Sequence, residues 1–312
     1  MKAQRNKTLL LTDEERELYL SRCITADCID KGGPAIDSII WGDTFDTMGK
    51  LPTGFADLMI VDPPYNLNKT FGESKFHRMD DDDYARYTEK WIQMSLPLLK
   101  RTASVYVCCD WQSSTVIAPI LKKYFILRNR ITWQREKGRG AAANWKNCME
   151  DIWYLTVSDK YTFNVDAVKQ RRRVIATYRD KGVPKDWEET ADGNFRDTYP
   201  SNFWDDISVP YWSMAENTPH PTQKPEKLMA KLILASSNEG DVVFDPFLGS
   251  GTTAVTAKKL KRRFVGVELD GEYCAMAQKR LEMAEEDKSI QGYTDGVFWE
   301  RNTVKEQKKY KK

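Results

Sequence analysis

The sequence predicts an α/β protein with a doubly wound, mostly parallel sheet and an inserted second region. Three observations carry this prediction. Short apolar runs alternate with segments of helical periodicity along much of the chain. The runs near residues 56–61 and 241–247 are mostly apolar, which is typical of strands covered on both faces. A length of 312 residues suits one large α/β domain that carries an inserted module.

The N-terminal half supplies strands and helices in alternation. Residues 38–43 (SIIWGD) predict a strand that ends in Asp43, and residues 56–65 (ADLMIVDPPY) predict the next one. Prolines cannot continue a central strand, so the second strand stops abruptly and presents Asp62 and Tyr65 at its tip. The other expected elements are a helix with a Thr12 capping box, a short helix at 44–52, a helix at 84–100, a strand at 104–110 and a helix at 112–124.

The C-terminal half contains a strand, a glycine-rich turn, a helix and a second strand that ends at Glu268, followed by a helix at 271–286. The acidic residue lies about twenty positions beyond the glycines, a spacing that suits a nucleoside ligand. Gly249 and Gly251 would let the backbone approach this ligand, and Glu268 would accept hydrogen bonds from ribose hydroxyls.

Other interpretations of the turn remain open. A phosphate-binding loop would need a lysine after Gly251, and Thr252 stands there instead. A dinucleotide fingerprint tolerates Ala254 at its third glycine position, and a plain structural turn needs no ligand at all.

The order of the units predicts a circular permutation. No further hydrophobic strand is expected after residue 286, and two strands cannot form a stable doubly wound sheet. If the C-terminal unit is placed before residues 38–66, an ordinary alternation of strands and helices results. Asp43 would then lie beside Glu268 and reach an adenine amine, although a role as a helix cap competes with this interpretation.

Four motifs in this order carry a family resemblance: DPPY at 62–65, HPTQKP at 220–225, DPFLGSGTT at 245–253 and VELD at 267–270. The combination resembles the S-adenosylmethionine-dependent DNA amino-methyltransferases, in the motif order of their β class. The resemblance covers residues 38–163 and 204–285. It implies a Rossmann-like methyltransferase fold, and S-adenosylmethionine as the methyl donor without a metal.

The resemblance also implies the roles of the strand tip. Asp62 and the carbonyl of Pro63, which Pro64 restricts, would accept hydrogen bonds from the amine of a flipped base, while Tyr65 would stack on that base. The cofactor would be held by Asp43, Thr222, Lys224, Asp245, Pro246, Phe247, Gly249, Ser250, Gly251, Thr252, Thr253 and Glu268. Thr222 and Lys224 precede a helix that starts at Pro225, so an ammonium group and a helix N-terminus would meet where a carboxylate could bind.

The target of the predicted transfer is adenine N6 in double-stranded DNA. Cytosine N4 is the alternative, and a catalytically silent DNA-binding protein of the same fold is a further one. Residues 168–185 carry seven basic residues and one acidic residue, in the region where the family reads its target. Phosphate contacts are expected from Arg171, Arg172, Arg173, Arg179 and Lys181, although a solvated face would look similar.

The expected regions are an N-terminal extension (1–37), a catalytic half (38–163), a target-recognition region (164–218), a cofactor-binding half (219–286) and a C-terminal tail (287–312). The six cysteines follow no zinc-ligand spacing and no apolar run is long enough to span a membrane, so a cytoplasmic enzyme is expected. The resemblance further allows a homodimer and a cognate restriction endonuclease as partners.

Overall fold

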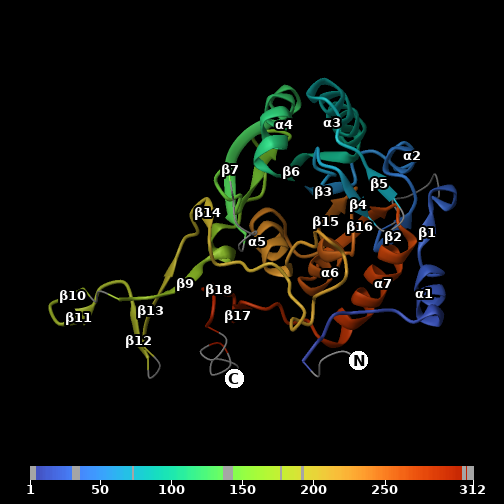
Figure 1. Cartoon of the computed structure of the whole chain (residues 1–312). Coiled ribbons are helices and arrows are strands. Elements are labelled where there is room, and N and C mark those ends of the chain that lie inside the picture. Colours follow the sequence, from blue (N-terminus) through green and yellow to red (C-terminus); the bar gives the residue numbers. More distant parts are fainter. Residues whose placement is uncertain are drawn as a thin grey trace.

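The computed structural model describes residues 5–29, 36–71, 74–135, 143–175, 178–190, 193–303 and 307. Within these residues the main layer is a nine-stranded sheet (Figure 1). Its strands lie in the order β1 (Ile24–Thr25), β2 (Ser38–Trp41), β16 (Arg263–Glu268), β15 (Val242–Asp245), β3 (Ala56–Val61), β6 (Leu99–Cys109), β8 (Met149–Thr156), β7 (Ile126–Gln134) and β14 (Phe203–Trp204). Neighbouring strands are parallel except at β8, which is antiparallel to β6 and to β7.

The predicted permutation is confirmed by the strand neighbours. β16 pairs in parallel with β2, and Glu268 lies opposite Trp41 in the register. β15 pairs on its other side with β3, the strand that carries the DPPY motif at its end. β16 and β15 therefore come from the C-terminal part of the chain but lie between two strands from its N-terminal part.

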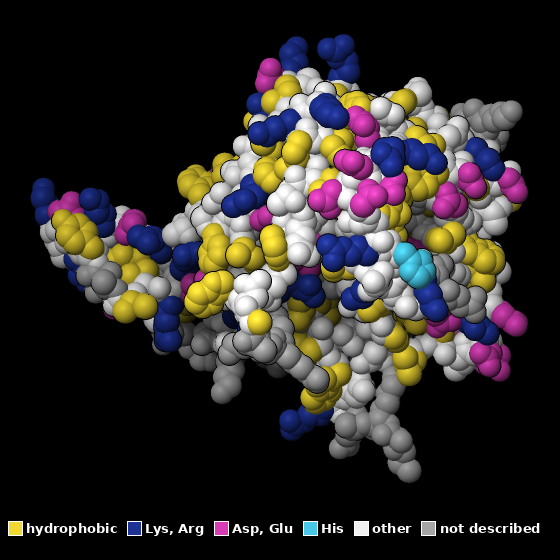
Figure 2. All heavy atoms as spheres, turned by 45° about the horizontal axis from the view of Figure 1, so that its top comes forward, with side chains coloured by type: hydrophobic (Ala, Val, Ile, Leu, Met, Phe, Trp, Pro, Cys, Tyr) yellow, Lys and Arg dark blue, Asp and Glu magenta, His cyan; other side chains and the backbone are white. Residues whose placement is uncertain are grey.

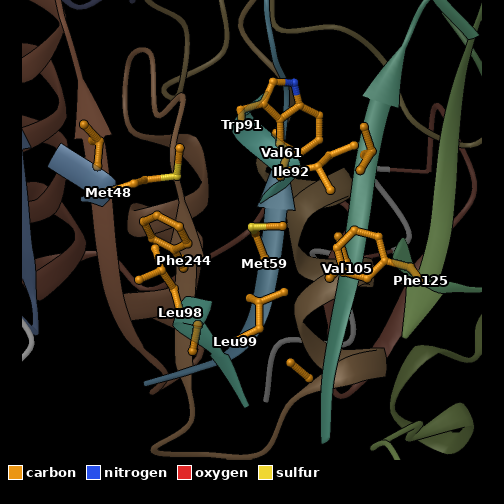
Figure 3. Packing of buried hydrophobic residues seen from close by; sticks show 14 of the residues in the cluster. Met48, Met59, Val61, Trp91, Ile92, Leu98, Leu99, Val105, Phe125 and Phe244 are labelled. Atoms are coloured by element: carbon orange, nitrogen blue, oxygen red, sulfur yellow. The ribbon is translucent and has the colours of Figure 1, made fainter. Parts of the chain in front are cut away.

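Helices cover both faces of this sheet. One face is covered by α2 (Thr44–Met48), α3 (Asp81–Ser95) and α4 (Trp111–Tyr124), and the other by α5 (Glu226–Ser236), α6 (Thr252–Lys259) and α7 (Gly271–Glu286). Alternate residues of one strand enter the two layers: Met59 and Val61 pack with Trp91 of α3 (Figure 3), whereas Leu58 and Ile60 pack on the opposite side. This explains why residues 58–61 of the strand are all apolar.

The described part of the N-terminal extension packs on the folded body. α1 (Asp13–Leu20) begins with the expected capping box between Thr12 and Glu15. It packs on α7, where Lys279 donates to Glu15 and the Tyr19 hydroxyl donates to Glu282. β1 then extends the edge of the sheet beside β2, and a 3₁₀ turn follows it (Ala26–Cys28).

A second sheet of five strands forms beside the main one, in the order β12 (Glu188–Thr190), β13 (Gly193–Thr198), β9 (Gln170–Arg173), β18 (Val297–Trp299) and β17 (Tyr293–Thr294). A hairpin of β10 (Arg179–Asp180) and β11 (Val183–Pro184) extends this region into an arm that projects from the body (Figures 1 and 2). Another hairpin, β4 (Lys69–Phe71) with β5 (Ser74–Phe76), follows the DPPY motif. Further 3₁₀ turns span Leu96–Leu98 and Val165–Val168.

The expectation that no hydrophobic strand follows residue 286 is wrong. β18 pairs in parallel with β9, and its Phe298 and Trp299 are buried, the latter against Phe195. A three-residue apolar run is too short to show a period, and its partner strand is distant in sequence. Residues 304–306 and 308–312 of the predicted tail lie outside the described part of the chain.

Gly251 is required by helix packing. Its φ of +87° is left-handed, and a Cβ at this position would lie 2.5 Å from the Cβ of Ala277 on α7. The glycine therefore allows the start of α6 to lie against α7, a reason that differs from the close approach to a ligand inferred from the sequence.

We expect Gly251→Ala to lower the free energy of unfolding by about 2–3 kcal/mol, because it combines an unfavourable φ with a backbone clash. Gly240→Ala is a matched control, since Gly240 has a φ of +86° and no atom within 4 Å of the position that a Cβ would take. Urea unfolding of both variants measures the difference, and equal losses would show that the contact with Ala277 has no cost.

Candidate active site

One cavity of about 400 Å³ lies at the carboxyl ends of the parallel strands. Asp43 follows β2, Asp62 follows β3, Asp245 ends β15 and Glu268 ends β16, and all four line this cavity. Carboxyl ends of neighbouring parallel strands meet at one edge of a sheet, which is where α/β proteins bind ligands. The permuted topology thus brings the DPPY motif and the glycine turn with Glu268, which lie far apart in the sequence, to the same site.

The DPPY tip is held by a hydrogen-bond network. The Tyr65 hydroxyl donates to Oδ1 of Asp62 at 2.9 Å, and the Lys224 ammonium donates to Oδ2 of Asp62 at 2.6 Å. The Tyr84 hydroxyl donates to the carbonyl of Pro64 at 3.0 Å, which fixes the backbone of the turn. The carboxylate therefore has a defined position at the end of a rigid strand.

Lys224 and Glu150 complete a buried charge cluster that the sequence did not indicate. The Lys224 ammonium lies 3.4 Å from Oε2 of Glu150, and Arg135 donates to Oε1 of Glu150 at 2.5 Å. Burial alone would lower the pKa of Lys224, but the charges of Asp62 and Glu150 outweigh it and raise that pKa, so the lysine stays charged. Two carboxylates share this one ammonium group.

The start of α5 differs from the expected carboxylate site. Its first amide, that of Glu226, donates to the carboxylate of Glu216 at 2.7 Å. Lys224 turns toward Asp62 and Glu150, so the ammonium and the helix N-terminus both have partners within the protein. Thr222 lines the cavity beside them.

Glu268 lines the same cavity from the end of β16. Its Oε2 accepts the Gly249 amide at 2.7 Å and its Oε1 accepts the Asp270 amide at 2.8 Å. Burial raises the pKa of Glu268 to about 7, although these backbone hydrogen bonds act in the opposite direction. The carboxylate therefore shapes the glycine turn and still faces the cavity as an acceptor.

His220 supports the same turn. Its ring lies close to the position that a Cβ on Gly249 would take, and it packs edge-on against Tyr273 with ring centroids 4.5 Å apart. Burial and the nearby cations Lys224, Arg280 and Lys69 lower the pKa of His220 to about 3, so the ring is neutral.

Asp43 caps a helix, which is the competing role considered for it from the sequence. Its Oδ1 accepts the amides of Phe45 and Asp46 in the first turn of α2. Its Oδ2 makes no hydrogen bond with a described residue, and the side chain lines the cavity next to Glu268. A contact from Oδ2 to an adenine amine is compatible with the cap.

The cavity contains most of the residues singled out from the sequence. Its lining includes Asp62, Pro63, Pro64, Tyr65, Asp43, Thr222, Lys224, Asp245, Phe247, Gly249, Ser250, Thr252, Thr253 and Glu268. Two expected cofactor residues do not line it: Gly251 packs against α7, and the carbonyl of Pro246 accepts a hydrogen bond from Thr44. Lining residues that sequence reasoning missed include Lys69, Asp110, Arg135, Glu150 and Tyr273, because they follow no motif and come from separate elements.

The five expected DNA contacts lie outside the cavity, in the second sheet and its arm. Arg171 forms a two-pronged ion pair with Asp197, with both distances 2.7 Å. Arg179 pairs with Glu189, and Lys181 is exposed in the turn between β10 and β11. Arg171 and Arg179 are therefore held in ion pairs, whereas Lys181 is exposed to solvent.

The permuted sheet carries an acidic strand tip and a glycine turn at one cavity, as expected for a DNA methylase. Residues 56–279 match the DNA methylase family, which is well over half of the chain. The protein belongs to this family. Among the described residues no helix is long and apolar enough to cross a membrane.

Two curated relatives are each 33% identical to this chain over the aligned residues. The DNA adenine methyltransferase YhdJ of Escherichia coli (strain K12) is 33% identical over 259 residues, which are 81% of this chain and 85% of the relative. The type II methyltransferase M.HpaI of Haemophilus parainfluenzae is 33% identical over 249 residues, or 78% of this chain and 74% of the relative.

Solved structures agree in fold. The M1.HpyAVI–SAM complex is 26% identical with a TM-score of 0.54, and the match covers 78% of this chain and 98% of the other. The cytosine-N4-specific PvuII DNA methyltransferase has a TM-score of 0.60 at 15% identity, with 81% and 92% covered. At that identity the second likeness concerns the fold alone.

Proposed function

We propose that this DNA methylase transfers the methyl group of S-adenosylmethionine to N6 of an adenine that is flipped out of double-stranded DNA. The observation that carries the proposal is that Asp62 and Glu268 line one cavity, at the ends of two strands that are separated by β15. A nucleoside held at Glu268 and an amine held at Asp62 would lie within one enclosed volume, so the two reacting groups would be positioned together.

The residues of the cavity fit this cofactor. Glu268 offers acceptor oxygens for ribose hydroxyls, Asp43 offers Oδ2 to an adenine amine, and Phe247 supplies an apolar wall near Trp91. When bound, S-adenosylmethionine supplies an electrophilic methyl group. The adenosine half of the cofactor would thus be recognised by residues that lie apart from Asp62.

Asp62 would make the target amine a better nucleophile. The lone pair of an exocyclic amine is delocalised into the base, and an acceptor for its hydrogens favours the tetrahedral geometry of attack. Asp62 supplies this acceptor, the Pro63 carbonyl supplies a second one, and the Tyr65 ring offers a surface on which the base stacks. The negative charge of Asp62 also stabilises the positive charge that develops on the nitrogen.

Adenine is preferred over cytosine as the target for two reasons. An aspartate stands at position 62, which favours adenine within this family, and the relative YhdJ is named a DNA adenine methyltransferase. Cytosine N4 remains the second candidate, because it presents the same kind of amine. Incubation of the protein with tritiated S-adenosylmethionine and mixed duplex DNA, followed by nucleoside analysis, separates the two. Label in N4-methylcytosine would overturn the choice of adenine, and no label would overturn the activity.

We further propose that the second sheet and its arm hold the DNA. Phosphate contacts are expected from Arg171, Arg172, Arg173, Arg179 and Lys181, of which Arg171 and Arg179 also form the ion pairs described above. The arm shows basic and acidic side chains together with exposed apolar ones (Figure 2), so the expected phosphate contacts would come from individual cations and not from a uniformly basic surface.

The triple variant Arg172→Ala, Arg173→Ala, Lys181→Ala should weaken DNA binding in a salt-dependent way. Each lost phosphate contact is expected to reduce the slope of log affinity against log salt by about one unit. Fluorescence anisotropy at several salt concentrations measures this slope. Lys261→Ala, which removes a cation paired with Glu239 in another region, is the matched control. An unchanged slope in the triple variant would assign the basic run to a solvated face.

The remaining proposals concern partners and location. A homodimer and a cognate restriction endonuclease are proposed from the resemblance to type II methyltransferases, and the state of assembly can be measured by light scattering. A cytoplasmic location is proposed because all six cysteines are free thiols, which is typical of a reducing compartment.

A further inference from the structure

Asp62 has both of its oxygens engaged in the structure. Oδ1 accepts the Tyr65 hydroxyl at 2.9 Å, and Oδ2 accepts the Lys224 ammonium at 2.6 Å. A target amine that donates to Asp62 must therefore share an oxygen with one of these donors or replace it. The proposed role of Asp62 thus requires that one existing hydrogen bond can be moved at low cost.

Glu150 is placed to receive a donor from Asp62. Its Oε2 lies 3.2 Å from the Tyr65 hydroxyl and 3.4 Å from the Lys224 ammonium, so both donors already have a second acceptor within reach. Its other oxygen, Oε1, is held by Arg135. The Glu150 side chain is only 4% exposed, which keeps it in this position.

The Tyr65 hydroxyl is the donor that can move without breaking an ion pair. Burial and the charges of Asp62 and Glu150 raise the pKa of Tyr65 well above its ordinary value, so the hydroxyl stays protonated and must donate to one of them. A rotation of the hydroxyl hydrogen takes it from Asp62 to Glu150, while Lys224 stays on Oδ2 and keeps the carboxylate in place.

We propose that Glu150 is a positioning residue, which takes over the Tyr65 hydroxyl when the target amine arrives and so frees Oδ1 of Asp62 to accept the amine hydrogen. The inference rests on the proposed role of Asp62. No covalent bond changes in this step, because one hydrogen bond is exchanged for another between two carboxylates. Since both acceptors carry a charge, the exchange is nearly balanced in free energy.

Glu150→Gln tests the exchange, because an amide oxygen is a weaker acceptor than a carboxylate and leaves the hydroxyl on Asp62. With saturating cofactor and DNA, the single-turnover rate of methyl transfer should fall roughly tenfold or more. The affinities for cofactor and for DNA should stay within roughly twofold of the wild type. The decisive measurement repeats the substitution in a Tyr65→Phe background, which has no hydroxyl to move. There Glu150→Gln should change the rate by less than roughly threefold.

Asp151→Asn is the matched control. Asp151 is the next residue of β8, faces the other side of the sheet, and contacts Arg130 and Thr132 outside the cavity. Its substitution removes a buried carboxylate from the same strand and should leave the single-turnover rate unchanged. Thermal unfolding of each variant establishes that it is folded. If Glu150→Gln does not fold, Glu150→Asp poses the same question, because it keeps the charge but withdraws it from the Tyr65 hydroxyl.

Three results would overturn the inference: an unchanged rate in Glu150→Gln, an equal loss in the wild-type and Tyr65→Phe backgrounds, or an equal loss in Asp151→Asn. The function itself is tested separately in the same assay. Methyl transfer by the wild type tests the activity, and Asp62→Ala tests the role of Asp62, so failure of either is distinguishable from failure of the exchange.

Discussion

Asp62→Ala is expected to reduce the rate of methyl transfer by roughly two to four orders of magnitude while cofactor affinity changes little. The amine loses its charged acceptor and its position, so the lone pair is no longer directed at the methyl group. In the proposed site the adenosine part of the cofactor would be held at Glu268 and Asp43, which make no described hydrogen bond with Asp62. Single-turnover transfer of a tritiated methyl group, together with calorimetry of cofactor binding, measures both quantities.

Two further variants make this test sharper. Asp62→Asn keeps an acceptor oxygen but loses the charge opposite Lys224, so its activity should be low and above that of the alanine variant. Asp57→Ala removes a carboxylate from the same strand, where it pairs with Lys100 away from the cavity, and should retain activity. If Asp62→Ala methylates at the wild-type rate, the DPPY tip is only structural.

Glu268→Ala is expected to weaken cofactor binding by roughly 10- to 100-fold, because a charged hydrogen bond to the ribose is worth about 1.5–3 kcal/mol. The structure adds a second cause, since Glu268 also holds the amide of Gly249 in the glycine turn. Calorimetry measures the dissociation constant. Glu272→Ala, near the start of the following helix and outside the cavity, should bind normally. Unchanged affinity in a folded Glu268→Ala protein would remove this residue from the cofactor site.

The raised pKa of Glu268 predicts that both stability and cofactor affinity depend on pH. Because burial raises the pKa of Glu268 from 4.5 to about 7, the folded protein holds a proton there that the unfolded chain releases. Its contribution to stability is therefore largest below pH 4.5 and is lost as the pH rises through 7. Ribose binding favours the ionised carboxylate, so cofactor affinity should fall by up to about tenfold per pH unit below 7. Burial also raises the pKa of Asp245 to about 7. The same pH series on the Glu268→Ala protein therefore measures the part of the pH dependence that is due to Glu268. A flat affinity between pH 8 and 6 would contradict this.

The sequence predicted the sheet and the two ends of the cavity because both depend on local patterns. Buried parallel strands are continuously apolar, and the residues directly after them, such as Asp62 and Glu268, lie at one edge by topology alone. The same reasoning placed β16 beside β2 across more than two hundred residues, which the strand pairing confirms.

The missed parts depend on contacts that no local pattern records. Glu150 reaches the cavity because β8 runs antiparallel, so its first residues lie at the edge where the other strands end. The place of Lys224 before a helix predicts a contact with a cofactor carboxylate, which stays a prediction, but it gives no sign of the contacts with Asp62 and Glu150. β18 was missed because three apolar residues acquire meaning only beside β9.

The position of β15 and β16 in the middle of the sheet has a consequence for synthesis on the ribosome. When the first 240 residues have been translated, β2 and β3 have emerged, but the two strands that separate them have not. The nascent chain then exposes apolar strand edges and lacks the glycine turn. Pairing of β2 and β3 into the main sheet must therefore wait for residues 242–268, and until then the unpaired apolar edges of these strands are open to self-association.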